Sequence, residues 1–510
     1  MVETQTSPGV LEWEDSEEGI RPYVKMPEGR RIAVTWAPQP GSQEAFLQCP
    51  VFECLYAGTR GPGKTDALLM DFAQHVNQGW GSDWRGVLFR RTYPELQDVI
   101  DKSKKWFPKI WPDAKFNEAK NFWRWPKGEI LFFRHFMKKA DYWSYHGHAY
   151  PWIGWEELTT WPSDECYKSM FSCARSTAVG LPIKVRSTTN PYGVGHNWVK
   201  SRWRLPILPG KVVGPVIKNS MDIEGNVEPP RVAIHGRLSE NQILLRANPD
   251  YIIRLRAAAQ NKSQLAAWLE GDWNIVAGGM FDDVWWARTH VLPDFPLRLI
   301  PRSWKLNRSY DHGQSAPFSV GWWAESNGED PILWDGRLIG DVRGDLIRIA
   351  EWYGWSGRSN EGIRMQSKDI AQGILDREEE WGLSGKVRRG PADSSIFDDY
   401  EPGKSVAGDM AKLGVHWDPS DKSPGSRKQG WEQLRLLLSQ SFLPKGSSKR
   451  ETPGLFICGG RCQQFLRTIP VLPRDDDDLD DVDSESEDHI ADEARYRVRQ
   501  QNKTVKQRDM

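Results

Sequence analysis

Gly58-Thr59-Arg60-Gly61-Pro62-Gly63-Lys64-Thr65 fits the phosphate-loop pattern G-x-x-x-x-G-K-[ST] at every position. The run before it, Phe52 to Ala57, is apolar apart from Glu53 and predicts a buried strand, and the run after it, Asp66 to Ala73, predicts a helix. Glycines between a strand and a helix let backbone N–H groups turn toward a phosphate, and the helix N-terminus adds its positive dipole end. The stretch therefore predicts a nucleotide-binding loop in an α/β domain.

The positions of this motif have separate expected roles. Gly58, Gly61 and Gly63 supply the backbone conformations that bring the N–H groups around the phosphates. Lys64 is expected to reach the β- and γ-phosphates, and the Thr65 hydroxyl is expected to ligate Mg²⁺. The predicted cofactors are therefore ATP and Mg²⁺ or Mn²⁺.

A second motif lies in residues 150–158, where an apolar strand ends in Glu156-Glu157. The first carboxylate of such a pair holds Mg²⁺, and the second orients the attacking water. Glu156 stands where an Asp is usual, and Pro151 and Gly154 interrupt the strand. Adjacent acids in isolation usually face solvent, but these fall at the strand end that α/β topology places beside a phosphate loop. Glu157 is the better candidate for catalysis.

Three further features of the N-terminal half each keep two readings open. Gln43 is able to donate and accept at an adenine edge, or is simply a surface side chain. Arg91, at the end of a predicted strand, is either a phosphate sensor or part of a solvated pair. Residues 183–191 predict a strand ending in small polar residues, which either sense the γ-phosphate or form a turn before a proline.

Carboxylates in the C-terminal half predict a second chemistry. Asp311 ends a predicted strand, Asp393 follows a basic run, and Asp488 and Asp492 lie one turn apart on a predicted helix. Acids contributed by a first strand, a later strand and a C-terminal helix suit a nuclease of RNase H type. Such an enzyme uses two Mg²⁺ or Mn²⁺ ions to activate water and to steady the leaving oxygen.

Composition limits the class of protein. The chain has 510 residues, with 68 Lys and Arg against 69 Asp and Glu, so any DNA contact depends on local patches. The six cysteines show no metal-binding spacing and predict reduced thiols in a cytosolic protein. An acidic start argues against a signal peptide, and no apolar run is long enough to span a membrane. The predicted parts are a flexible arm (1–30), an ATPase domain with connector (31–285), a nuclease domain (300–498) and a basic tail (499–510).

Taken together, these runs resemble the large terminase subunit of tailed bacteriophages, the motor and nuclease that packages DNA into an empty capsid. The resemblance covers roughly residues 40–500. It implies an α/β chain with an N-terminal P-loop ATPase domain of RecA/helicase type, followed by an RNase H-like nuclease domain. It also implies ATP-driven translocation of double-stranded DNA into the procapsid, with metal-dependent endonuclease cleavage of concatemeric DNA.

The resemblance also assigns roles to single residues. Gln43 occupies the place of the adenine-contacting Gln of that family, and Arg60 within the loop is expected to stabilise charge in the transition state. Asp492 is implied as the third nuclease ligand, with Asp488 as its rival. The implied metal ligands of the nuclease are Asp311, Asp393 and Asp492.

The same resemblance implies partners and a location. The partners are double-stranded DNA, the portal protein of the procapsid, a small terminase subunit and further copies in a ring when docked. The location is the cytoplasm of the infected bacterial host, without a membrane. Two other readings stay open: a P-loop DNA helicase or remodeller without nuclease activity, and a non-catalytic assembly protein whose site has decayed, which Glu156 in place of Asp would favour.

Overall fold

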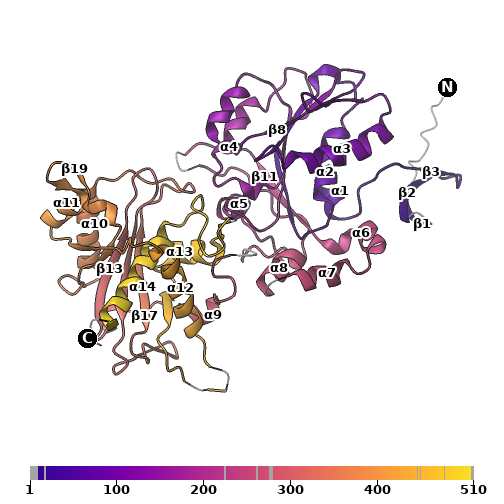
Figure 1. The fold of residues 1–510 in the computed structure, drawn as a ribbon. Helices are drawn as coiled ribbons and strands as arrows, with labels where there is room; N and C mark the ends of the chain where they lie inside the picture. Colours follow the sequence, from indigo (N-terminus) through magenta and orange to yellow (C-terminus); the bar gives the residue numbers. More distant parts are fainter. Residues whose placement is uncertain are drawn as a thin grey trace. The chain divides into compact units, whose positions relative to one another are not determined.

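A computed structural model gives the fold of the chain in two compact units, Met1–Ala277 and Gly278–Met510 (Figure 1). The sequence colours run from indigo to pink in the first unit and from pink to yellow in the second. The structure describes residues 10–16, 19–222, 225–259, 262–274, 279–444, 446–447, 449–475 and 477–506.

A small antiparallel sheet precedes the first unit's main sheet. It consists of β1 (Val10–Ser16), β2 (Gly19–Lys25) and β3 (Arg31–Ala33), where we expected a flexible arm. Cross-strand polar pairs hold it: Tyr23 donates to Glu12, and Arg31 bonds Glu14 at 2.6 Å. The apolar alternation that marks a strand is short here, with Leu11 and Trp13 between Glu12 and Glu14, and the surrounding charge outweighed it in the prediction.

The main sheet of the first unit has eight strands. Strands β11 to β8 run parallel, and the last two are antiparallel at the edge. Strands predicted around the phosphate loop and the acidic pair are confirmed as β4 and β9. In spatial order the strands are β11 (Arg231–Gly236), β4 (Glu53–Gly58), β10 (Lys184–Thr188), β9 (Trp152–Trp155), β5 (Arg85–Arg90), β8 (Ile130–His135), β7 (Phe122–Arg124) and β6 (Lys115–Asn117).

Helices cover both faces of this sheet. Strand β4 is buried along its whole length, as expected for a central parallel strand. Its residues alternate between two cores: Cys54 and Tyr56 pack with helices α2 and α3, whereas Leu55 and Ala57 pack with α5. The helices of this unit are α1 (Ser42–Leu47), α2 (Lys64–Ala73), α3 (Leu96–Ile110), α4 (Glu165–Ser169), α5 (His196–Trp203), α6 (Gln242–Ala247), α7 (Tyr251–Ala258) and α8 (Lys262–Glu270).

The second unit is built on a seven-stranded sheet. An antiparallel meander of β13, β14 and β17 is extended on one side by β18 and β21, parallel to β13, and on the other by β22 and β12. In spatial order the strands are β12 (Val291–Leu292), β22 (Leu455–Cys458), β17 (Leu346–Tyr353), β14 (Ser319–Glu325), β13 (Lys305–Asp311), β18 (Gly390–Ala392) and β21 (Trp417–Pro419).

Helices α10 and α14 lie on opposite faces of this second sheet. Arg308 of β13 bonds Glu378 of α10 at 2.6 Å, and the next residue, Ser309, bonds Glu493 of α14. Successive strand residues point to opposite faces, so the two helices enclose the sheet. The remaining elements are α9 (Ala287–His290), β15 (Ile332–Trp334), β16 (Arg337–Ile339), α10 (Ser367–Glu380), β19 (Asp399–Glu401), β20 (Lys404–Ser405), α11 (Val406–Lys412), α12 (Ser426–Gln440), α13 (Gln463–Thr468) and α14 (His489–Lys506).

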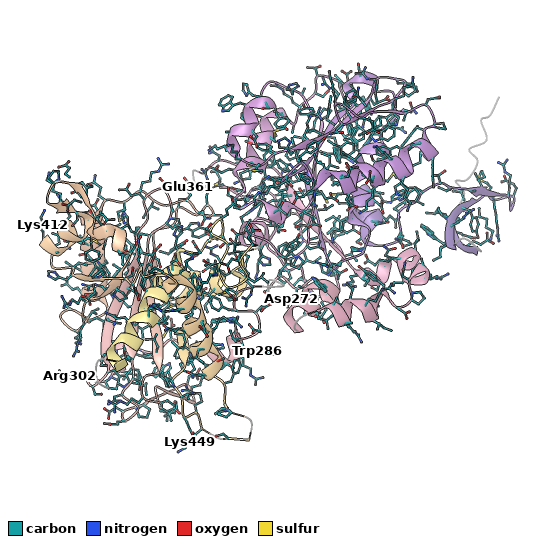
Figure 2. The ribbon with its side chains drawn as sticks, viewed as in Figure 1. Asp272, Trp286, Arg302, Glu361, Lys412 and Lys449 are labelled. Carbon is teal, nitrogen blue, oxygen red and sulfur yellow. The ribbon has the colours of Figure 1, made fainter. Side chains whose placement is uncertain are left out.

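The boundary between the two units lies earlier in the chain than the predicted end of the ATPase domain. Asp272, labelled in Figure 2, follows α8 of the first unit, and Trp286 precedes α9 of the second. Met280 and Phe281, which we had placed in the connector of the ATPase domain, pack in the core of the second unit. The basic tail expected from residue 499 continues α14 as far as Lys506.

The predicted fold class is confirmed. A mainly parallel sheet entered through a phosphate loop is followed by a mixed sheet with helices on both faces, which is the α/β architecture of two domains that the motifs predict. All six cysteines are buried, and none of them is in a disulfide. Among the helices of the described residues, none combines the length and apolar character needed to cross a bilayer.

Candidate functional site

The phosphate loop joins β4 to α2, and its glycines are required by its backbone. Gly58 has φ +131°, and a Cβ there would lie 2.2 Å from the carbonyl oxygen of Gly236 on β11. Gly63 has φ +81°, and a Cβ there would lie 2.2 Å from the side-chain amide nitrogen of Gln43. Only glycine avoids both the strain and the collision. The loop is therefore held from two sides, by β11 and by Gln43.

Lys64, Asn190 and Glu157 form a hydrogen-bonded bridge beside this loop. The Lys64 ammonium donates to the Asn190 side-chain oxygen at 2.8 Å and to the Thr59 carbonyl at 2.6 Å. The Asn190 amide nitrogen donates to Glu157 Oε1 at 3.0 Å. These residues follow β4, β10 and β9, which are adjacent and parallel, so their carboxyl ends meet at one edge of the sheet.

The backbone at Glu157 is in the left-handed region, with φ 52° and ψ 58°. This conformation is uncommon outside glycine and costs about 1 kcal/mol or more. Thr159 and Thr189, two residues beyond Glu157 and one before Asn190, are hydrogen-bonded through their hydroxyls at 2.7 Å. This hydroxyl bond joins the segments that follow β9 and β10, and the Glu157 carboxylate accepts from Asn190 beside it.

Glu156 lies on the other side of the strand end and is buried. Burial raises the pKa of its carboxyl to about 7, although Arg90 Nε lies 3.7 Å from Glu156 Oε2. The neighbouring Thr65 side chain opposes this shift and lowers the pKa of the same carboxyl. A hydroxyl and a carboxylate side by side at a phosphate loop fit the oxygen ligands that Mg²⁺ prefers. The residues present therefore fit the predicted ion.

Gln43, Arg60 and Arg91 occupy places that sequence reasoning did not specify. The Gln43 amide donates to the loop carbonyls of Pro62 and Gly63 at 3.2 and 3.0 Å. The Arg60 guanidinium lies 4.1 Å from the ring centroid of Trp268, and its backbone N–H donates to the Trp268 carbonyl. Arg91 donates to the Thr160 carbonyl at 2.9 Å, in the turn that follows Glu157.

Asp311 is the buried centre of the carboxylate group in the second unit. Its Oδ1 accepts from the Tyr496 hydroxyl and its Oδ2 from His489 Nδ1, both at 3.2 Å. Burial raises the pKa of Asp311 to about 6. Burial alone would lower the pKa of His489, but Asp311 and the neighbouring acids raise it to about 9, so the imidazole is a cation here. Asp311 is therefore neutralised from within α14.

Asp393 lies at the end of the strand next to β13. Its backbone N–H donates to the Tyr310 carbonyl, which brings it beside Asp311. One side-chain oxygen accepts from Lys422 Nζ at 2.9 Å, and the other accepts from the Ser395 hydroxyl at 2.8 Å. Burial opposes ionisation, but Lys422 and the Ser395 bonds lower the pKa of Asp393 overall.

Asp488 and Asp492 share one cation, Arg427 of α12. Arg427 Nη2 lies 3.2 Å from Asp488 Oδ2, and Nη1 lies 3.1 Å from Asp492 Oδ2. Asp492 also accepts from Arg495 at 3.0 Å. Burial, followed by the charge of Asp492, raises the pKa of Asp488 to about 7. Asp492, the expected third ligand, and its rival Asp488 thus both belong to the group.

Glu493 anchors the helix that carries these acids. It is fully buried, accepts from Trp323 Nε1 at 3.0 Å, and pairs with Arg348 Nη1 at 2.5 Å. Arg348 is itself fully buried on β17. This buried pair fixes the rotation of α14, because another rotation would separate the Glu493 carboxylate from Arg348 in the interior.

The predicted nuclease ligands come together in one region but not as a metal site. Within the part of the chain that the structure describes, no three His, Cys, Asp or Glu side chains gather so as to hold an ion. Their oxygens are of the type that Mg²⁺ and Mn²⁺ prefer, but each of Asp311, Asp393 and Asp492 already contacts a cationic side chain. As placed, the group does not fit two bound metal ions, and Asp311, Asp393 and Asp492 remain predictions.

Two contributors to these sites were missed as individual residues. Asn190 lies in a run that we had singled out, but nothing in it indicates a bridge between Lys64 and Glu157. Arg427 is 61 and 65 residues from Asp488 and Asp492. No local pattern marks a contact over such a separation.

Comparison of the sequence with protein-family models and with curated proteins finds no match. Among solved structures, the chain is similar to the large terminase of a thermophilic bacteriophage, with 15% identity, 91% of this chain and 99% of that one covered, and a TM-score of 0.36. For the HK97 bacteriophage large terminase the values are 12%, 89%, 94% and 0.39, and for the P22 large terminase nuclease domain 14%, 44%, 92% and 0.30. A further structure of the thermophilic phage enzyme holds ADP. The solved structures named here are large terminases or their domains, and this is the family that the motifs of the chain resemble.

Proposed function

We propose that this protein is a DNA-packaging motor whose first unit hydrolyses ATP to translocate double-stranded DNA into a procapsid. The Lys64–Asn190–Glu157 bridge carries the proposal, because it joins a phosphate-binding cation to a candidate catalytic carboxylate across adjacent strand ends. The proposed partners are the portal protein, a small terminase subunit and further copies in a ring, in the cytoplasm of the infected bacterial host.

Each residue of the first site has a proposed task. Lys64 exchanges its Asn190 and Thr59 partners for the β- and γ-phosphates, and Glu157 orients the attacking water. Bound Mg²⁺, held through Thr65 and Glu156, would neutralise charge on the phosphates. Arg60 stabilises transition-state charge once it leaves Trp268.

Substitutions at the ends of the bridge test the ATPase. We expect Lys64→Ala to abolish ATP hydrolysis, because the charge that binds the β- and γ-phosphates is lost. We expect Glu157→Ala to bind ATP but to stop turnover, because the water loses its orienting base. Phosphate release and equilibrium binding of a fluorescent ATP analogue measure the two effects. Equal turnover in wild type and Glu157→Ala would reject that role.

The second proposed activity is metal-dependent cleavage of concatemeric DNA by the carboxylates of the second unit. One observation favours the alternative of a P-loop DNA helicase or remodeller without nuclease activity: among the described residues, no three ligands gather. Incubation of the protein with plasmid and Mn²⁺, with and without ATP, separates the two. Cleavage that Asp311→Ala abolishes while ATP hydrolysis persists supports the nuclease, and intact plasmid throughout supports the alternative.

A further inference from the structure

The Arg427 side chain is bonded to three carboxylates at once. Its Nε donates to Asp481 Oδ1 at 2.7 Å, its Nη1 to Asp492 Oδ2 at 3.1 Å, and its Nη2 to Asp488 Oδ2 at 3.2 Å. It is the second residue of α12, which packs beside α14 (Figure 1). A single guanidinium therefore joins the start of α14 to the segment that leads into it.

Neighbouring side chains hold the Arg427 guanidinium in place. The Arg427 guanidinium lies 5.4 Å from the ring centroid of Trp431, one turn further along α12. Trp431 is fully buried, and its Nε1 donates to the same Asp481 oxygen at 2.8 Å. Arg495 approaches the Trp431 ring at 5.1 Å. The Arg427 side chain is nevertheless 33% exposed, so ions in solution are able to reach it.

Arg427 therefore does what a bound divalent ion would do. Carboxylates brought close together repel unless a cation lies between them. The planar guanidinium bonds several carboxylate oxygens in fixed directions and carries its charge at every accessible pH. Lys422 stands in the same relation to Asp393. An ion that ligates Asp488 or Asp492 has to replace these bonds, and that exchange reduces its net affinity.

We propose that Arg427 takes the place of a divalent ion among the acids at the start of α14: it holds Asp488 and Asp492 itself, so that any ion has to compete with it for their oxygens. This inference rests on the proposed nuclease function. It assigns Arg427 a positioning role rather than a catalytic one. It also predicts that the free protein binds divalent ions weakly at this site, so that the nuclease is restrained by a residue of its own unit.

Binding of Mn²⁺ to the full-length protein tests the proposal without any assay of cleavage. Free Mn²⁺ is measured by electron paramagnetic resonance in the absence of DNA and nucleotide, and the nuclease share of binding is the part that Asp311→Asn removes. Arg427→Gln is expected to bind about tenfold or more tightly, because charge-assisted bonds no longer compete. Arg427→Lys should be intermediate, because an ammonium lacks the guanidinium fork. Lys428→Gln is the matched control, since its partner is the partly exposed Asp478.

A second readout guards against a folding defect. Without metal, Arg427→Gln is expected to have a lower Tm than wild type, because three carboxylates lose their counter-ion, and saturating Mn²⁺ should restore it. Equal Mn²⁺ affinity in wild type, Arg427→Gln and a folded Arg427→Lys would overturn the competitor role and leave the nuclease proposal standing. Mn²⁺ binding that Asp311→Asn leaves unchanged in every variant would overturn both.

Discussion

Replacing Asn190 with Ala removes the bridge and leaves both of its ends in place. In the structure Asn190 makes two hydrogen bonds to charged groups, one from the Lys64 ammonium at 2.8 Å and one to the Glu157 carboxylate at 3.0 Å. In the proposed ATPase, the phosphates of bound ATP would replace Asn190 as partners of Lys64. The bond to Glu157 would then be the one that matters for hydrolysis, because it orients the Glu157 carboxylate.

The magnitude follows from that single bond. A hydrogen bond to a charged group contributes about 1.5–3 kcal/mol. At about 1.4 kcal/mol for each factor of ten in rate, its loss should lower kcat by about 10- to 100-fold. Asn190 is half-buried, so the free energy of unfolding should fall by only about 1 kcal/mol. ATP affinity should change by less than about threefold, because Lys64 keeps its charge.

Single-turnover phosphate release measures the effect on hydrolysis, and titration with a fluorescent ATP analogue measures binding. Gln48→Ala is the matched control: it removes another amide of the same unit, which is exposed and bonds Glu44 at 3.2 Å. If Asn190→Ala hydrolyses ATP as fast as Gln48→Ala does, the bridge has no part in catalysis. If affinity falls as much as kcat, Asn190 positions Lys64 rather than Glu157.

Two further predictions concern buried charge. Burial lowers the pKa of His196 from 6.5 to about 3. As the pH falls from 7 to 5, the unfolded chain therefore binds a proton that the folded chain excludes, and the free energy of unfolding falls by about 2 kcal/mol. Urea unfolding of His196→Asn at both pH values should lack that loss, and an unchanged loss would contradict this role of His196. Glu493→Gln leaves the buried Arg348 with Glu351 alone, and we expect a loss of about 3 kcal/mol in thermal unfolding. A Tm equal to that of wild type would show that Glu493 does not anchor α14.

The elements that the sequence predicted well are defined by residues close together in the chain. The strand, loop and helix around Lys64 follow one another within a few residues, and the acidic pair ends a strand whose place is dictated by parallel topology. Glu157 and residues 183–191 meet at the loop because the carboxyl ends of adjacent parallel strands share an edge, which favours one of the two readings left open for that run. That the Asn190 amide joins them depends on side-chain rotamers, which no sequence pattern encodes.

The parts that sequence missed depend on charge pairing across long separations or on exposed strands. Arg427 reaches acids more than sixty residues away, and a lone basic residue at a helix start normally reads as solvated. In β1 to β3 the apolar face is small: Leu11 pairs with Val24 and Val24 with Ile32, while charged residues such as Glu12, Glu14 and Arg31 cover the other face. Pairing between such residues stabilises a sheet only after the strands have met.

The charged side chains of the two candidate sites have different partners. Lys64 is bonded to neutral oxygens, whereas Asp492 is bonded to an arginine, and this difference affects how each site would bind its ligand. The Lys64 ammonium is held by a carbonyl and an amide oxygen, neutral acceptors that do not cancel its charge, and burial accordingly lowers its pKa to about 8. An anionic phosphate relieves that cost on arrival, so binding needs no prior separation of charges. Asp492 is already neutralised by Arg427, so a metal ion must first break a pair that the fold has made. We therefore expect the charge of Lys64 to favour phosphate binding at the first site, and the ion pairs of Asp492 to oppose metal binding at the second.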